Sequence, residues 1–212
     1  MPQFFTLHPE HPQPRLVKQA VEIVRGGGLI ALPTDSAYAL AGHIGDAAVI
    51  DRIRRLRGVD ERHHFTLMCR DLSEIATYAR VDNAVYRLLK ATTPGSYTFI
   101  LEGTKELPRR LLHPKRKSIG LRVPDHPLVL ALLEELGEPL LTSTLIPAGE
   151  DEPMDDAEAI RDRLGKQLDL VIDAGACGRE VTTVINLANG APELIRAGRG
   201  SLAPFGLEDV HG

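Results

Sequence analysis

Hydroxyl and carboxylate side chains follow directly after a short apolar stretch in the first fifth of the chain. Residues 29–32 (LIAL) predict a buried strand, and residues 33–38 (PTDSAY) come next. In an open α/β sheet, ligands bind beside the loops that follow the strands. Thr34, Asp35 and Tyr38 therefore carry groups that can hold a small polar ligand. A capped turn is the alternative explanation for the same residues.

Four arginines crowd the helix that is predicted after Asp46, namely Arg52, Arg54, Arg55 and Arg57. Such a run is typical of a solvated helix face. Arg54 and Arg57, however, share one face of the helix, because residues three apart are neighbours on its surface. A guanidinium that leaves a helix end toward a cleft suits forked contacts with phosphate. The sequence leaves both interpretations open.

A second group of positive charges lies between residues 108 and 117, a stretch without any acidic residue. Its members are Arg109, Arg110, Lys115, Arg116 and Lys117. The whole chain has 25 Lys and Arg against 29 Asp and Glu, a net charge of −4, so this basic segment is a local island that can meet RNA phosphates, ATP or only solvent. Five Phe, four Tyr and no Trp leave little for base stacking, which argues against a reader of single strands. Contact with folded RNA through its shape stays open.

Three consecutive hydroxyls, Thr142, Ser143 and Thr144, end a strand predicted over residues 139–145. Side chains alternate along a strand, so Thr142 and Thr144 face one way and Ser143 the other. No serine-hydrolase elbow surrounds Ser143. A strand that is simply rich in Thr is the alternative.

Several familiar sites are missing from the sequence. No Gly-x4-Gly-Lys-Ser/Thr loop occurs, and the glycines at 26–28 precede a strand instead of following one, so they end a helix. The eight His show no metal-binding spacing, and no tightly bound metal is expected. Cys69 and Cys177 predict free thiols in a reducing cytosol, with Cys177 a loop thiol and not a nucleophile.

The elements that must position these residues form one α/β domain. The chain has 212 residues, 43% of them hydrophobic, and no apolar run long enough for a membrane helix or a signal peptide, so we expect a cytoplasmic protein. We expect an extended surface segment at residues 1–14, a domain over 15–205 and a short tail at 206–212. Helical patterns alternate with strand patterns, which predicts a single domain with a twisted, mixed parallel and antiparallel sheet and flanking helices. The strand-rich last third predicts antiparallel pairing there.

The order of the motifs resembles the YrdC/YciO family. The stretches that carry the resemblance are 32–40, 94–101, 120–127, 139–144, 182–185 and 196–198, while 3–9 and 65–72 are most similar to the YciO branch. The resemblance implies a nucleotidyltransferase, the threonylcarbamoyl-AMP synthase. It implies that threonine, bicarbonate and ATP with Mg²⁺ give threonylcarbamoyl-adenylate for tRNA modification at adenosine 37. It further implies a concave basic cleft and double-stranded RNA binding.

The same resemblance implies roles for individual residues. Thr34 would hold threonine, Arg122 would pair with the threonine carboxylate, and Arg57 would contact the nucleotide phosphates. The implied substrate-binding residues are Thr34, Asp35, Tyr38, Arg122 and Ser143. The implied nucleotide-binding residues are Arg55, Arg57, Thr144 and Arg196.

The sequence also departs from the family pattern. Arg55 replaces a Lys, Gly58 replaces a Pro, the stretch 59–64 is longer than in the synthases, and Ile146 replaces an Asn. An isoleucine cannot donate or accept the side-chain hydrogen bonds of an asparagine, and removing such a hydrogen bond can lower a rate ~100-fold. We therefore expect weak or altered synthase activity. The alternatives are an RNA- or tRNA-binding protein with a decayed cleft, and a cleft that takes a different adenylate or small acid.

Overall fold

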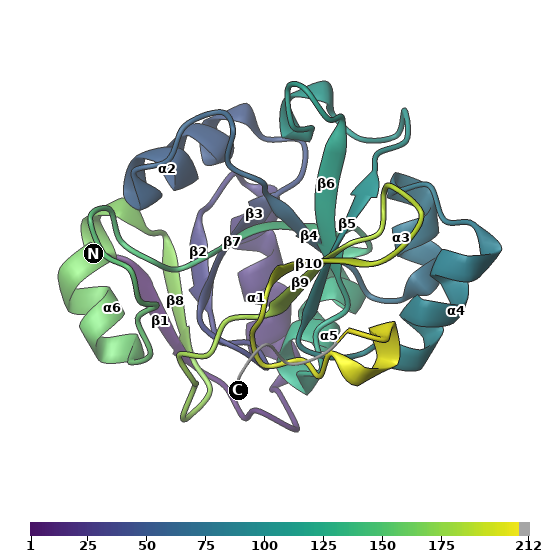
Figure 1. Cartoon of the computed structure of the whole chain (residues 1–212). Coiled ribbons are helices and arrows are strands. Elements are labelled where there is room, and N and C mark those ends of the chain that lie inside the picture. Colours follow the sequence, from purple (N-terminus) through teal and green to yellow (C-terminus); the bar gives the residue numbers. More distant parts are fainter. Residues whose placement is uncertain (208–212) are drawn as a thin grey trace.

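A ten-stranded sheet runs through the computed structural model, which describes residues 1–207 (Figure 1). The strands lie in the order β1-β8-β2-β3-β7-β4-β6-β5-β9-β10. Their bounds are β1 (Gln3–Thr6), β2 (Ile30–Leu32), β3 (Ala39–His43), β4 (Thr66–Met68), β5 (Tyr97–Glu102), β6 (Ser118–Arg122), β7 (Leu140–Thr144), β8 (Leu170–Asp173), β9 (Thr183–Asn186) and β10 (Glu193–Arg196). β4 and β6 are parallel, whereas β3 and β7 are antiparallel. The predicted mixed sheet is confirmed.

Helices cover both faces of the sheet. Their bounds are α1 (Pro14–Arg25), α2 (Ala47–Arg57), α3 (Leu72–Tyr78), α4 (Asn83–Thr92), α5 (Pro127–Leu136) and α6 (Ala157–Leu164), with short 3-10 turns η1 (Arg109–Leu111), η2 (Gly165–Gln167) and η3 (Ala203–Phe205). One hydrophobic cluster joins α1 and α5 to the sheet, and the other joins α2, α3, α4 and α6 to it. The predicted single α/β domain with flanking helices is confirmed.

The start of the chain belongs to the sheet. β1 pairs in parallel with β8, and Phe5 and Leu7 are buried, so the prediction of a surface segment is wrong for these residues. The sequence offers no local signal for this pairing, because the partner strand lies more than 160 residues further along the chain. The predicted tail at 206–212 lies outside the described residues from position 208 onward.

The last third of the chain is less antiparallel than its short turns predict. β9 and β10 form an antiparallel hairpin, but β8 is parallel to both β1 and β2, and β9 is parallel to β5. Neighbouring strands along the sequence therefore join distant parts of the sheet. Among residues 1–207, we find no helix with both the length and the apolar character needed to cross a bilayer.

Candidate functional site

A cavity of about 440 Å³ opens on the sheet and brings together strands from most of the chain. Its floor follows one row of the sheet: Thr142 of β7 pairs with Thr66 of β4, which pairs with Gly120 of β6, which pairs with Ile100 of β5. Three of the four residues in this row, Thr142, Thr66 and Gly120, have a small side chain or none, which leaves space above the sheet. A Cβ at Gly120 would lie 2.8 Å from the Thr66 hydroxyl oxygen, so glycine gives the floor its depth.

Arg57 enters the cavity from the last residue of α2. The Asp46 side chain caps the other end of this helix, and Val49, Ile53 and Leu56 bury one face of it. The Arg57 guanidinium donates to the hydroxyl oxygen of Ser143 at 2.8 Å. Burial, and secondarily the charge of Arg196, lowers the pKa of Arg57. A nearby anion would relieve both effects.

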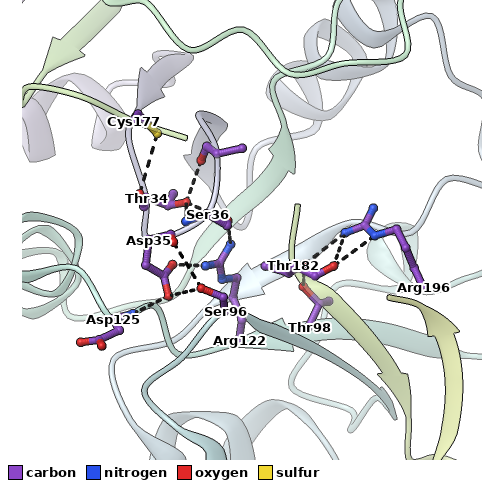
Figure 2. A network of polar contacts seen from close by, with 11 residues as sticks. Thr34, Asp35, Ser36, Ser96, Thr98, Arg122, Asp125, Cys177, Thr182 and Arg196 are labelled. Carbon is purple, nitrogen blue, oxygen red and sulfur yellow. Dashed lines mark hydrogen bonds and ion pairs between the residues drawn. The ribbon is translucent and has the colours of Figure 1, made fainter. Parts of the chain in front are cut away.

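Arg122, the last residue of β6, is 5% exposed and forms an ion pair with Asp35 (Figure 2). It also donates to the Ser36 hydroxyl at 3.3 Å. The other Asp35 carboxylate oxygen accepts from the Ser96 hydroxyl at 3.1 Å and from the backbone N–H of Asp125 at 3.0 Å. Burial lowers the pKa of Arg122, and the Asp35 carboxylate counteracts it. Asp35 therefore holds Arg122 in place at the cavity wall.

Arg196 reaches the cavity from β10, at the edge of the sheet. Its guanidinium donates to the backbone carbonyl of Thr182 at 2.9 Å and to the hydroxyl of the same residue at 3.1 Å (Figure 2). Burial, and then the charge of Arg122, lowers the pKa of Arg196. Three arginines that are distant in the sequence thus line one cavity, where Arg196 lowers the pKa of Arg57 and Arg122 lowers that of Arg196.

Of the remaining predicted site residues, some line the cavity and others lie outside it. Ser143, Thr144 and Tyr38 line the cavity, but the Tyr38 hydroxyl donates to the backbone carbonyl of Ile172. Thr34 does not line it: its hydroxyl donates to the carbonyl of Ala37 at 2.6 Å inside its own turn.

Arg55 is also away from the cavity. Its side chain is exposed on α2 and donates to the carbonyl of Asp51. The helix turns Arg55 and Arg57 to different sides, because residues two apart do not share a face. The five cations of the basic segment, residues 109–117, are all exposed on the connection between β5 and β6.

Sequence reasoning missed two histidines that line the cavity. The Nε2 atom of His63 lies 2.9 Å from the Ser143 hydroxyl oxygen, and that of His64 lies 3.3 Å from the Ser118 hydroxyl oxygen. Burial and the charge of Arg57 lower the pKa of His63 to about 4. Adjacent histidines fit no metal spacing, and the serine partner of His63 is 80 residues away, so no local pattern indicates this contact.

A second cavity, of about 450 Å³, lies on the other side of the Asp35–Arg122 pair. Its lining includes Thr34, Asp35, His126 and Cys177. The Cys177 thiol donates weakly to the carbonyl of Thr34 (Figure 2), and burial raises the pKa of the thiol. Cys69 is fully buried, and both cysteines are free.

The sequence matches the Sua5/YciO/YrdC family model, described as telomere recombination, over residues 22–198. The chain belongs to the Sua5/YciO/YrdC family. It is 55% identical over 205 residues to the protein YciO of Escherichia coli K12, which is described as uncharacterized, and the match covers 97% of this chain and all of YciO. The crystal structure of E. coli YciO superposes with a TM-score of 0.94, covering 97% of this chain and 100% of that one.

More distant members of the family carry an activity in their names. The threonylcarbamoyl-AMP synthase of Nitrosococcus oceani is 31% identical over 157 residues, which covers 74% of this chain and 84% of the synthase. P. abyssi Sua5, solved in complex with L-threonine, has a TM-score of 0.84 at 22% identity, and the match covers 92% of this chain and 57% of Sua5. The likeness to Sua5 shows the shared fold.

Proposed function

We propose that the cavity binds ATP together with threonine and bicarbonate, and that it supports weak or altered threonylcarbamoyl-adenylate synthase chemistry linked to tRNA threonylcarbamoyladenosine formation. One observation carries this proposal: Arg57, Arg122 and Arg196 line a single cavity. A synthase of the same family and a related structure that holds L-threonine support it.

The proposed reaction has two bond-forming steps. The threonine amine attacks the bicarbonate carbon, and loss of water gives a carbamate. A carbamate oxygen then attacks the α-phosphorus of ATP, and the bond to the leaving pyrophosphate breaks. All three substrates carry negative charge, so holding them together requires positioning and charge neutralisation.

The arginines supply that neutralisation from three directions. Arg57 on α2 and Arg196 on β10 would contact the phosphates of ATP. Arg122 would pair with the threonine carboxylate, which would share the guanidinium with Asp35. Planar guanidinium groups bind carboxylate and phosphate oxygens in pairs, which fixes the orientation of the ligand as well as its charge.

Magnesium enters this proposal with ATP. Within residues 1–207, we find no group of three or more His, Cys, Asp or Glu side chains placed to share a metal ion. The phosphate oxygens of ATP are themselves ligands that Mg²⁺ prefers. The metal would then shield phosphate charge beside Arg57 and Arg196.

Release of pyrophosphate tests the proposal. We expect threonine- and bicarbonate-dependent release from ATP by the unchanged protein, and a rate about 100-fold lower in the Arg57→Ala variant, because a charge-stabilising donor is removed. Arg55→Ala is the matched control, since it removes an arginine from the same helix outside the cavity. Equal rates for the unchanged protein and Arg57→Ala would contradict the proposal.

The weakness of the activity has its own test in the same assay. Ile146 lines the cavity and brings an apolar side chain to a polar wall. An Ile146→Asn variant restores an amide that both donates and accepts, and we expect it to raise the rate of pyrophosphate release. An unchanged or lower rate would show that Ile146 does not limit the chemistry.

Binding of folded RNA is the second candidate, and the exposure of the basic segment favours it. Arg109, Arg110, Lys115, Arg116 and Lys117 all face solvent. The segment also reaches the cavity wall, because the rings of His113 and His64 stack with centroids 4.7 Å apart. A tRNA or a double-stranded RNA held here would lie beside the cavity.

A further inference from the structure

The Ser143 hydroxyl connects two side chains of the cavity wall. The guanidinium of Arg57 has no acceptor atom, so its Nη1–H must donate to the Ser143 oxygen at 2.8 Å. The Nε2 atom of His63 lies 2.9 Å from the same oxygen. A serine oxygen has one proton and two lone pairs, and Arg57 occupies one lone pair.

The position of one proton therefore decides what Ser143 offers to a ligand. If Nε2 of His63 carries no proton, Ser143 donates to it and keeps a lone pair for the cavity. If Nε2 is protonated, it fills the second lone pair, and the serine proton is left for the cavity. The wall is an acceptor in the first arrangement and a donor in the second.

The surroundings of His63 favour the first arrangement. The charged and titratable groups around its ring are Arg57 and Arg54 on α2, with His64 and Asp60 in the same loop. Nε2 of His63 and the Arg57 guanidinium approach the same Ser143 oxygen, so the cation favours a lone pair at Nε2 and disfavours an N–H there. Arg57 also polarises the Ser143 hydroxyl, which strengthens its donation to an imidazole nitrogen, so the chain from Arg57 through Ser143 to His63 is cooperative.

We propose that His63 is a positioning residue that holds the proton of Ser143, so that Ser143 presents a lone pair to the cavity and selects a ligand N–H or O–H group. The three arginines take the anionic part of a ligand, and Ser143 takes a donor on the same ligand. Discrimination between threonine and a simple carboxylate rests on the proposed function; the position of the proton does not.

Nitrogen NMR of the full chain tests the position of the proton directly. At neutral pH, we expect the His63 signals of a neutral ring with its proton on Nδ1 and none on Nε2. A His63→Gln variant identifies these signals by their disappearance. A proton on Nε2, or a doubly protonated ring, would overturn the proposal.

Binding of L-threonine and of butyrate tests the selection, because butyrate has a carboxylate and no N–H or O–H donor at neutral pH. In His63→Leu, we expect the preference for threonine over butyrate to fall about 5- to 10-fold, the effect of one hydrogen bond, while butyrate affinity is unchanged. His63→Gln, whose amide oxygen accepts the serine proton, restores part of the preference. His43→Leu changes a half-buried histidine that the structure places outside the cavity and serves as the control.

These results separate the inference from the proposed function. An unchanged preference in His63→Leu would overturn the selection by Ser143. A protein that binds neither threonine nor ATP would contradict the proposed function, and the NMR measurement would still decide which atom holds the proton.

Discussion

Arg122 is a cation inside the protein, and its stability there depends on one carboxylate. Its side chain and that of Asp35 are 6% and 8% exposed, so solvent screens the pair very little. A buried ion pair does not by itself make the fold more stable than apolar packing would. Removing one partner, however, leaves the other charge buried without a counterion, which is strongly destabilising. Asp35 is therefore more important to the fold than its place in a loop indicates.

The variant Asp35→Ala measures this dependence. We expect it to lower the free energy of unfolding by about 3–5 kcal/mol, because it leaves the buried Arg122 guanidinium without its counterion. Urea unfolding followed by circular dichroism gives the value. Asp155→Ala removes one of the two carboxylate partners of the exposed Arg179, the other being Glu152, and should change stability far less. Similar losses of stability in the two variants would contradict this account.

At the scale of elements, α2 is the part that aims Arg57. Its end is set by Gly58, which takes the left-handed conformation with φ of +64°. A Cβ at this position would lie 2.9 Å from the Cβ of Ala148. Glycine thus lets the chain turn away immediately after Arg57 and pass close to the loop that follows β7.

Two glycine substitutions separate the effect of backbone strain from the effect of the close approach to Ala148. Gly137 ends α5 with φ of +71°, but a Cβ there would meet no atom within 4 Å. We expect Gly137→Ala to lower the free energy of unfolding by about 1–2 kcal/mol from backbone strain alone. Gly58→Ala should lower it further, because the close approach of Ala148 is added. Equal losses of stability in thermal unfolding would show that the approach to Ala148 does not matter.

Local signals predict elements well where the ends of those elements are marked. The bounds of α5 are marked in the sequence itself, because Pro127 opens the helix and Gly137 closes it. β3 escapes prediction, since its residues ALAGH have weak strand preference. Gly42 in that strand is required by packing, because a Cβ would lie 2.3 Å from Val49 of α2.

The candidate site, too, is predicted only where a residue has a local sequence signal. The motifs point to Arg57, Arg122 and Arg196 one at a time, but only the three-dimensional arrangement shows that they share a cavity. The spacing of Arg55 and Arg57 shows that they do not share a helix face, but only the structure shows that Arg57 is the one in the cavity. His63 acquires its neighbours only through folding, as β1 does, so neither has a local signal.

At the scale of the whole molecule, the basic segment predicts salt-sensitive binding in a protein of net charge −4. We expect tRNA or double-stranded RNA to bind with an affinity that falls steeply with salt concentration, because binding releases counterions from the phosphates. Changing Lys115, Arg116 and Lys117 together to Ala should reduce the slope of log affinity against log salt by about 1 for each phosphate that no longer meets a cation.

A second triple variant with the same net charge controls for the change in the overall electrostatic field of the protein. Lys18, Lys90 and Lys166 are exposed on α1, α4 and η2, and replacing all three by Ala removes the same charge elsewhere. Titrations of labelled RNA at several salt concentrations give the two slopes. If both triple variants show the same slope, the basic segment does not bind the RNA.

The Asp35–Arg122 pair stands between two chambers: Asp35 borders one and Arg122 the other. An anion that drew Arg122 toward itself in the first chamber would weaken the contact of Arg122 with Asp35, which borders the second. By thermodynamic reciprocity, a guest beside His126 and Cys177 that disturbs Asp35 changes anion affinity across the partition by the same factor. We therefore expect the occupancy of one chamber to change the affinity of the other.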